Sequence, residues 1–517
     1  MPSQKPKEQD QAKIKETVLG KSTEQNQQTF SLRKRIGLIL GPVMFILILV
    51  FIPVTESFTF PMRSAFASTV WIALWWLTEA VPIPATSMLP LLLFPLTGVM
   101  SFGETATGYA DSIVFLFLGG FMLAAAMQRW NLHRRMALTV VKAMGPQPAR
   151  LIFGFMIATG FLSMWISNTA TSMMLMPVGL AVTLQVARLI KEQKLDIEVE
   201  AGKFSFGTAL MLGIAFSASI GGMGTLIGTP PNAIFASVAE STLEIDISFL
   251  DWMIFGFPLA IVFIIVAWFY LVNYFKLNQI KGLEAGKEVI DEEIRQLGPM
   301  KHEEKMVLTV FSIVALGWIT RSLFLDEIIP ALNDPMIAII GASLLFILPS
   351  DIRRGVFLLD WDSAVKIPWG ILLLFGGGIA IATSFSESGL TGWLGDQLAI
   401  LQHIPPLIVI FGIFALVVFL SNITSNTGTV SMILPVMIAM AGTMAVHPLG
   451  FMIVATSAAS FAFILPVATP PNAVIFGSGY VSIEQMARAG LWITLITILL
   501  LPLILYFWLP LTWGVSF

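Results

Sequence analysis

Long runs of apolar residues alternate with short polar segments along most of the chain, and this alternation predicts a bundle of membrane-crossing helices. Many of the runs reach the length of about 17–25 residues that an α-helix needs to cross a bilayer. Clear examples occupy residues 36–54, 255–272 and 490–509. The apolar stretches at 112–127 and 307–319 reach that length with their flanks. The pattern therefore predicts an all-α polytopic membrane protein.

The composition supports the same class. Of the 517 residues, 56% are hydrophobic and 12% are charged, a balance far from that of soluble proteins. Residues 1–35 differ: they are polar, rich in Gln, Lys and Glu, and lack the apolar core of a signal peptide. We expect them to form a disordered cytoplasmic tail. The chain has no cysteine, so disulfides and thiol chemistry are excluded. The expected surroundings are a lipid bilayer, and no nucleic acid is expected as a partner.

Lysine and arginine are distributed unevenly between alternate loops. With the N-terminus inside, 27 of the 29 basic residues fall on one side, and only Arg63 and Arg321 fall on the other. The opposite loops at 239–252 and 386–406 carry acidic residues and no lysine or arginine. Cytoplasmic loops of membrane proteins carry an excess of Lys and Arg. We therefore expect a multi-pass protein of the plasma membrane, with a cytoplasmic N-terminus and an extracellular C-terminus.

The same charge pattern predicts two re-entrant helical hairpins. Residues 150–188 begin and end on the basic side, whereas residues 396–447 begin and end on the other side. Each of these segments must therefore enter the membrane and return to the side from which it came. About 11 transmembrane helices together with the two hairpins satisfy all the charges.

Both hairpins carry the same small polar triplet, and a second motif is also duplicated. The triplet Ser-Asn-Thr stands at 167–169 and again at 425–427, an offset of 258 positions. The motif Thr-Pro-Pro-Asn-Ala at 229–233 recurs in all five places at 469–473. Because the two hairpins enter from opposite sides, the repeat is inverted. Inverted repeats with Gly- or Pro-interrupted spans are typical of secondary transporters, whose binding site lies at the repeat interface near the middle of the membrane.

The two motifs have opposite chemistry. A double proline breaks a helix, and a break inside a membrane must be buried in protein or line a cavity. The freed carbonyl groups of Gly228 and Ala468, with nearby hydroxyl and amide oxygens, suit small alkali cations. Thr169 and Thr427 begin new helices, whose first N–H groups lack internal partners and attract anions. Two such hairpin tips can each hold one end of a dianion.

Other functional classes fit the residues less well. The hairpin legs and broken spans show no ionisable residue, which argues against a proton relay and favours cation coupling or anion exchange. An intramembrane hydrolase needs a base or a metal beside its nucleophile, and no His, Asp or Glu stands beside Ser167 or Ser425. We therefore predict that the protein is not an enzyme. A channel stays possible and would pass ions orders of magnitude faster than a carrier.

At these motifs the chain resembles the divalent anion/sodium symporter (DASS) family, over about residues 35–515. The two Ser-Asn-Thr triplets and two Thr-Pro-Pro-Asn breaks in that order, together with "FLFLGGF" and "PPNAVIFGSG", carry the resemblance. It implies a homodimer that works by an elevator mechanism, with Na⁺ as the co-transported ion and no prosthetic cofactor. The activity it implies is sodium-coupled import of C4 dicarboxylates such as succinate, malate and fumarate. A sodium-independent dicarboxylate or citrate exchanger and a sodium/sulfate carrier are the alternatives.

The resemblance also implies a division of the chain into fixed and moving parts. Amphipathic segments at 131–146 and 389–403 would lie along the membrane surface and link these parts. The expected order is a tail at 1–35, a scaffold at 36–148 and 305–405, a transport domain at 149–275 and 406–517, and a cytoplasmic loop at 276–304.

The family's site residues can be carried over to matching positions. Two positions depart from the family pattern: Gly428 stands where Ala is usual, and Ser421 stands where sodium-coupled relatives often have Thr. Serine keeps the hydroxyl that a sodium ion needs. The implied substrate contacts are Asn168, Thr169, Asn426 and Thr427, helped by Ser167, Ser425, Pro230 and Pro470. The implied first sodium site is Ser163, Ser167, Asn168 and Gly228, and the second is Ser421, Thr424, Asn426 and Ala468.

Overall fold

The computed structural model describes residues 31–194, 197–277 and 286–517. The described chain is almost entirely helical, with one short antiparallel pair of strands, β1 (Pro349–Asp351) and β2 (Val356–Phe357). Within these ranges, ten helices are long and apolar enough to cross a membrane. The predicted count of about 11 spans differs because the two broken spans are divided into shorter helices, while arms of the predicted hairpins are among the ten.

The predicted disordered tail lies outside the described residues up to position 30. Its last residues belong to the first helix instead. The hydroxyl of Ser31 accepts a hydrogen bond from the Lys34 N–H at 3.4 Å and so caps α2 (Leu32–Phe51). The first apolar helix thus begins before the predicted position 36.

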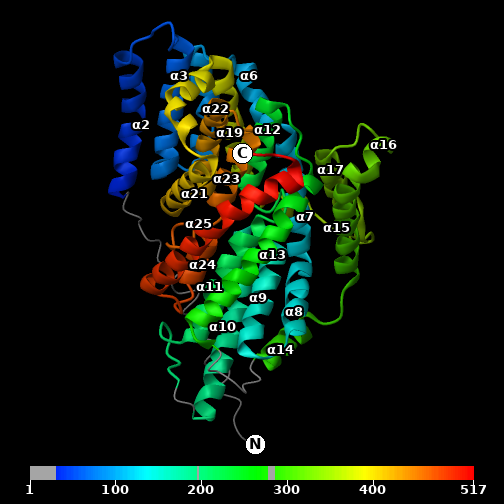
Figure 1. Cartoon of the computed structure of the whole chain (residues 1–517). Coiled ribbons are helices and arrows are strands. Elements are labelled where there is room, and N and C mark those ends of the chain that lie inside the picture. The colour runs from blue at the N-terminus through cyan, green and yellow to red at the C-terminus, as the bar shows by residue number, and fades with distance from the viewer. Residues whose placement is uncertain (1–30, 195–196, 278–285) are drawn as a thin grey trace, which may run out of the picture.

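The helices that follow α2 form the first group. Its residues 58–100 contribute to a hydrophobic cluster that is separate from the main core, whereas its residues 113–141 belong to the main core. Trp76 and Phe94 are fully buried in the separate cluster, which α19 also joins through Leu374 and Phe385. Figure 1 shows α2 and α3 at one end of the molecule, far from α8 and α14. The group consists of α3 (Phe60–Thr78), α4 (Ile83–Thr86), α5 (Pro90–Thr97), α6 (Phe102–Thr107), the turn η1 (Gly108–Ala110), α7 (Ser112–Arg129) and the amphipathic α8 (Leu132–Met144).

The second group is built around α11, which is buried from residue 206 to its end. Glycines allow its neighbours to approach closely, since the backbone of Gly160 in α9 lies directly against Gly221 in α11. The helices are α9 (Pro148–Ser163), α10 (Asn168–Glu192), α11 (Ser205–Gly222), α12 (Pro230–Leu243) and α13 (Phe249–Tyr274).

The polar loop at 276–304 is more ordered than a simple solvated connector in its described part. It contains α14 (Lys287–Leu297), which packs against α8. Ion pairs join the two helices, Arg134 to Glu293 and Lys142 to Asp291, the latter at 2.8 Å. The hydrogen bond from Lys142 holds the pKa of Asp291 below its usual value. The amphipathic α8 is therefore tied to this loop as well as to the bundle.

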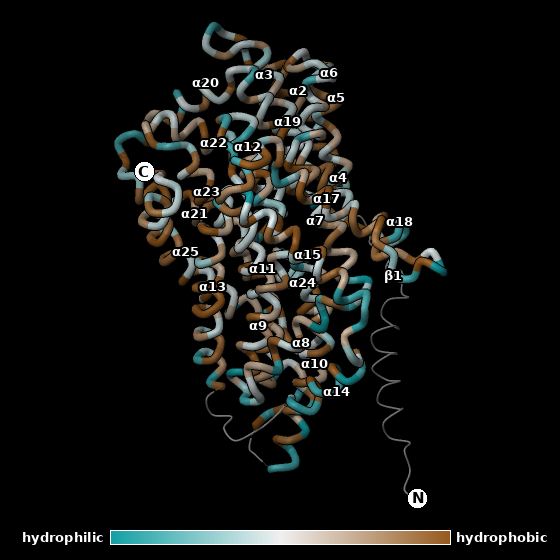
Figure 2. Tube along the Cα trace, turned by 90° about the vertical axis from the view of Figure 1, so that its right-hand side faces the viewer, coloured by the Kyte–Doolittle hydropathy of each residue, from teal (hydrophilic) through white to brown (hydrophobic). Residues whose placement is uncertain are grey.

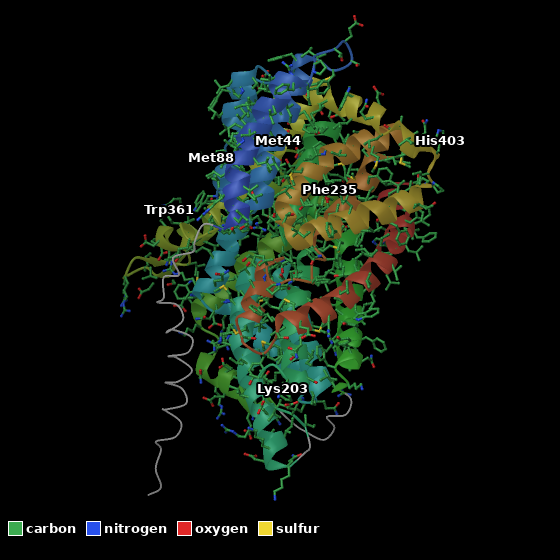
Figure 3. The ribbon with its side chains drawn as sticks, turned by 90° about the vertical axis from the view of Figure 1, so that its left-hand side faces the viewer. Met44, Met88, Lys203, Phe235, Trp361 and His403 are labelled. Carbon is green, nitrogen blue, oxygen red and sulfur yellow. The ribbon has the colours of Figure 1, made fainter. Side chains whose placement is uncertain are left out.

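The third group resembles the first in its helix order. Arg321, one of the two basic residues on the predicted outer side, is buried and pairs with Asp334 at 2.7 Å, which offsets its charge. Figure 3 shows Trp361 on a lobe that projects from the side of the bundle. The elements are α15 (His302–Thr320), a π-helical turn η3 (Arg321–Leu325), α16 (Asp326–Ile328), α17 (Asp334–Ile347), α18 (Trp361–Ala364), α19 (Trp369–Ser388), α20 (Leu390–Gln397) and η4 (Ala399–His403).

The last group completes the repeat. The series from α19 to α25 repeats the order of α7 to α13: a long helix, an amphipathic helix, two hairpin arms, a helix broken in two, and a final long helix. Figure 2 shows hydrophobic residues along the length of the bundle and hydrophilic residues gathered towards its ends and at α14. The helices are α21 (Pro406–Ile423), α22 (Asn426–Met444), α23 (Pro448–Ala459), α24 (Pro470–Phe476) and α25 (Ile483–Trp513).

The contact between α9 and α11 gives a test of the packing. A Cβ atom at position 221 would overlap the Gly160 backbone, which cannot give way as a flexible side chain can. We expect Gly221→Ala to destabilise the protein by about 1–3 kcal/mol and to lower its melting temperature in detergent. Gly412→Ala in α21 is the matched control, because a Cβ there meets open space. An unchanged melting temperature for Gly221→Ala would contradict the close α9–α11 packing.

Candidate functional site

The tip of the first hairpin is a sharp break between two helices. α9 ends at Ser163 and α10 begins at Asn168. The hydroxyl of Ser167 accepts a hydrogen bond from the Ala170 N–H at 3.3 Å and caps α10. The N–H groups of Asn168 and Thr169 are left without partners inside the helix, at its partially positive end. The tip is therefore suited to an anion.

Oxygen atoms converge immediately behind this tip. The Ser163 hydroxyl donates to the Ala218 carbonyl at 2.6 Å and lies 2.5 Å from the side-chain amide of Asn168. That amide atom also lies 3.3 Å from the Ala218 carbonyl oxygen and 3.2 Å from the Gly228 carbonyl oxygen. These neighbours are all acceptors when the Asn168 side-chain NH₂ group occupies that position, so the amide donates to the Ser163, Ala218 and Gly228 oxygens and holds the three of them together. Hydroxyl, amide and carbonyl oxygens are the ligands that sodium takes in such transporters.

The double-proline break holds one side of this cluster in place. The chain between α11 and α12 is not helical, and the Asn232 amide bridges it by donating to the carbonyls of Gly222 at 3.1 Å and Thr225 at 2.8 Å. The indole of Trp252 donates to the Met223 carbonyl at 2.9 Å. The Thr225 hydroxyl donates to the Met164 carbonyl of the hairpin at 2.5 Å. Side chains thus satisfy the carbonyls that the break exposes, as a low-dielectric interior requires.

The second break is built in the same way. The Asn472 amide donates to the carbonyls of Ala462 at 3.3 Å and Leu465 at 3.0 Å, at positions that match those bridged by Asn232. The Asn422 amide oxygen of the second hairpin accepts the Ile464 N–H at 2.9 Å. Both halves therefore tie their hairpin to their broken helix, which supports the predicted repeat.

The second hairpin differs from the first in how its oxygens are used. The hydroxyl oxygen of Ser421 and the amide oxygen of Asn426 are both buried and have no hydrogen-bond partner among the described residues. The Thr424 hydroxyl instead donates to the Leu420 carbonyl at 2.9 Å and lies 2.7 Å from the Thr429 hydroxyl. Leaving a buried polar atom unpaired costs about 1–3 kcal/mol. Ser421 and Asn426 are therefore free to accept a ligand.

A cavity of about 590 Å³ opens beside the first tip. Ser167 and Thr169 line it from the tip, whereas α7 and the chain that leads into α19 line it from the opposite wall. Over the described residues, its lining includes no residue of the second tip. Its full lining is Phe121, Ala124, Ala125, Gln128, Arg129, Ser167, Thr169, Ala170, Met173, Ser363, Lys366, Ile367 and Pro368.

The structure brings together some of the expected site residues and separates others. Ser163, Asn168 and Gly228 meet in one cluster, whereas Ser167 turns its hydroxyl to the helix cap and lines the cavity. Of the others, Pro230 and Pro470 are the first residues of α12 and α24, and Thr427 and Ala468 are buried. Asn426 is the first residue of α22, and Ser425 directly precedes it at the N-cap position.

Three contributors were not found from the sequence. Asn232 and Asn472 hold the breaks, and their identity at matched positions of the repeat was a usable signal. The carbonyl of Ala218 left no signal, because any residue supplies a backbone oxygen. One sequence argument also needs correction: α12 runs to Leu243 and includes Glu240, so the broken span does contain an ionisable residue. Glu240 lies at the exposed end of the helix, where it accepts a hydrogen bond from Ser112 at 3.0 Å.

A multi-pass helical fold with two broken-helix repeats and an oxygen cluster behind a helix start defines the class of secondary transporters. The chain belongs to the divalent anion/sodium symporter family: residues 33–514 match the family described as "Sodium:sulfate symporter transmembrane region". The match confirms the family predicted from the motifs and makes the protein a multi-pass membrane transporter rather than an enzyme.

Named relatives and solved structures agree with this family. The chain is 42% identical over 499 residues to the sodium-dependent dicarboxylate transporter SdcS of Staphylococcus saprophyticus, covering 96% of this chain and 95% of that protein. It is equally similar to SdcS of Staphylococcus aureus strain USA300, with 42% identity over 500 residues and the same two coverages.

Two solved transporters share the fold at low sequence identity. Neisseria gonorrhoeae MtrF has a TM-score of 0.55 at 13% identity, covering 90% of this chain and 97% of that one. Alcanivorax borkumensis YdaH has a TM-score of 0.56 at 12% identity, covering 87% and 99%. These likenesses concern the fold alone.

The oxygen cluster predicts a sodium effect on stability. We expect sodium chloride, compared with potassium chloride, to raise the melting temperature of the wild type, because a bound ligand stabilises the folded state by up to about 2.7 kcal/mol at a concentration 100 times its Kd. Ser163→Ala should remove a large part of this shift and Ser163→Ala with Ser421→Ala nearly all of it.

Ser217→Ala is the matched control for that measurement. Ser217 is also a buried serine, but its hydroxyl donates only within its own helix, to the Gly213 carbonyl at 2.5 Å and the Ile214 carbonyl at 3.4 Å. The Ser217→Ala variant should keep the full rise in melting temperature that sodium causes in the wild type. An undiminished shift in Ser163→Ala would remove Ser163 from the cation site.

Proposed function

We propose that this protein imports C4 dicarboxylates such as succinate, malate and fumarate, coupled to sodium. The single observation that carries the proposal is the oxygen cluster of Ser163, Asn168 and the Ala218 and Gly228 carbonyls, directly behind the unpaired N–H groups of α10. A cation site and an anion site that share Asn168 are what a symporter of anions requires. The relatives named sodium-dependent dicarboxylate transporters, 42% identical over 96% of the chain, support the substrate class.

Charge balance supports the coupling. A dianion held in a low-dielectric site without a cationic partner is costly, and the hairpin tips at 163–169 and 421–428 carry no lysine or arginine. The partial positive charge of two helix starts offsets only part of that cost. Sodium ions bound beside the tips would offset the rest. Sodium and substrate should therefore bind cooperatively, each raising the affinity for the other by the same factor.

The proposed roles follow the two halves of the repeat. The substrate carboxylates contact Asn168, Thr169, Asn426 and Thr427, with help from Ser167, Ser425, Pro230 and Pro470. Of the first predicted set, Ser163, Asn168 and Gly228 hold the first sodium ion together with the Ala218 carbonyl, whereas the Ser167 hydroxyl caps α10. The second sodium ion takes Ser421, Thr424, Asn426 and Ala468. The buried and unpaired oxygens of Ser421 and Asn426 support the second set.

The proposed movement is that of an elevator. The transport domain, 149–275 and 406–517, moves across the membrane against the scaffold, 36–148 and 305–405, in each subunit of a homodimer. The cavity beside the first tip supports this division, because transport-domain residues form one wall and scaffold residues form the other. The N-terminus is cytoplasmic and the C-terminus extracellular in this proposal.

Uptake into proteoliposomes tests the function. We expect radiolabelled succinate to enter empty vesicles when an inward sodium gradient is present and not when potassium replaces sodium. Uptake that occurs only into vesicles preloaded with unlabelled succinate, and that ignores sodium, would identify the exchanger instead. Uptake of radiolabelled sulfate with no competition by succinate would identify the sodium/sulfate carrier.

Substitutions at the two tips test the site. Asn168→Ala and Asn426→Ala should each abolish sodium-driven succinate uptake, because each removes an amide shared by the substrate and a sodium ion. Asn273→Ala is the control, since Asn273 is an exposed asparagine of α13 that donates only to the Phe269 carbonyl of its own helix at 2.7 Å. Size-exclusion profiles should stay unchanged in all three. Retained uptake in both tip variants would remove the site assignment.

A further inference from the structure

The wall of the cavity opposite the first tip carries two basic side chains. Arg129 is the last residue of α7, and Lys366 stands just before the start of α19. Both line the cavity together with Thr169 of the tip, and over the described residues they are the only charged residues of its lining. The tip itself has no such charge, so the cavity joins a neutral anion site to a basic wall.

Neither basic group is fully used by the protein. One nitrogen of Arg129, Nη1, lies 2.7 Å from the Asp360 carboxylate, which leaves its other N–H groups for a ligand. Lys366 is exposed and forms no ion pair with any residue that the structure describes. The wall therefore has a net positive charge of about one when Asp360 is counted with Arg129 and Lys366.

Asp360 orients Arg129 and does not cancel the positive charge of the cavity wall. Its carboxylate accepts the Ser363 N–H at 2.8 Å and caps α18, which fixes its position. The hydrogen bonds from Ser363 and the charge of Arg129 hold the pKa of Asp360 below its usual value. The Arg129 guanidinium also lies 5.4 Å from the centre of the Trp130 ring. Arg129 is thus held in place at the edge of the cavity.

We propose that Arg129 and Lys366 form a second anion site, at which a dicarboxylate that has left the first tip is held before it enters the cytoplasm. The inference rests on the proposed function and adds a site on the scaffold that the substrate meets only on the basic side of the protein. The basic wall and Thr169 line the same cavity, so an anion that leaves the tip enters a space that the wall also lines.

Comparison of the two halves of the repeat shows that the positive charge of this wall has no counterpart in the other half. α19 corresponds to α7, and it ends in Ser386, Glu387 and Ser388 where α7 ends in Gln128 and Arg129. Before α7, the chain reads Gly-Tyr-Ala-Asp at 108–111, with no counterpart of Lys366. The structure therefore assigns a basic wall to the predicted cytoplasmic mouth and an uncharged or acidic one to the predicted outer mouth.

This asymmetry has a measurable consequence. A fixed positive wall raises the local concentration of an anion and its rate of encounter with the site. Half-saturation by internal dicarboxylate should then depend on Arg129 and Lys366, whereas half-saturation by external dicarboxylate should not. The effect should weaken at high ionic strength, because exposed charges are screened.

Counterflow in right-side-out membrane vesicles measures the two sides separately. The vesicles are loaded with different concentrations of unlabelled succinate, and entry of external radiolabelled succinate is followed at saturating sodium. We expect Lys366→Gln to raise the internal half-saturating concentration about threefold, and Arg129→Gln with Lys366→Gln to raise it about tenfold, as for exposed to partly buried ion pairs. Raising the ionic strength with choline chloride should shrink the difference from the wild type.

Arg353→Gln with Arg354→Gln is the matched control. These two arginines are exposed in the β1–β2 turn on the same side of the protein and do not line the cavity. They should leave both half-saturating concentrations unchanged. Lys366→Gln keeps the test valid if Arg129→Gln weakens the fold, because Lys366 forms no ion pair within the described part of the chain.

Three results would overturn the inference. Internal half-saturation that stays at the wild-type value in the Lys366 and double variants would exclude the second site. An equal rise on both sides, or a rise that ignores ionic strength, would indicate a structural effect. If the wild type itself carries no dicarboxylate, the proposed function fails first, and the inference fails with it. If the wild type transports dicarboxylate but the variants leave internal half-saturation unchanged, the second site fails while the proposed function stands.

Discussion

A helix that is broken inside a membrane exposes backbone groups that no water can satisfy, and the functional part of this protein is organised around four such breaks. Two lie at hairpin tips and two at double prolines. At the prolines, side chains of the protein donate hydrogen bonds to the exposed carbonyls. The Asn232 and Asn472 amides each bridge two of them, and the Trp252 indole donates to the Met223 carbonyl. At the tips the helix starts are left open. The same constraint thus produces rigid, oxygen-rich loops beside unpaired N–H groups, and a cation and an anion can be held next to each other.

The two halves of the repeat share a plan but differ in how completely it is assembled. In the first half, Ser163, Asn168 and two carbonyls are already within hydrogen-bonding distance of one another. In the second half, the corresponding oxygens of Ser421 and Asn426 are buried without partners. A pre-assembled cluster loses little entropy when an ion binds, whereas an open one must be drawn together. The difference gives a physical reason for the two proposed sodium sites to bind with different affinity.

Charged side chains are absent from the two hairpin tips and form ion pairs elsewhere in the protein. Ion pairs tie α8 to α14 and α15 on the basic side, and Arg321 is buried beside Asp334 near the start of α13. A permanent cation at a tip would bind the dianion without sodium and remove the coupling. The basic Arg129 and Lys366 line the cavity beside the first tip instead, where the proposed second site would attract a leaving anion without replacing ions at the tip.

Much of this architecture could be predicted from the sequence, because apolar length, the side preference of Lys and Arg, and Pro-Pro breaks are local signals. The hairpins, the repeat and the family follow from them, and the helix starts predicted at Thr169 and Thr427 lie one residue from the observed starts at Asn168 and Asn426. The tertiary structure alone decided which oxygens meet. Backbone carbonyls such as that of Ala218 cannot be recognised from the sequence, because every residue has one. The Ser167 hydroxyl caps α10 and does not join the cluster behind the tip. The tertiary structure also decided that Arg129 and Thr169 line one cavity, because they belong to α7 and α10, whose relative position depends on packing over the whole chain.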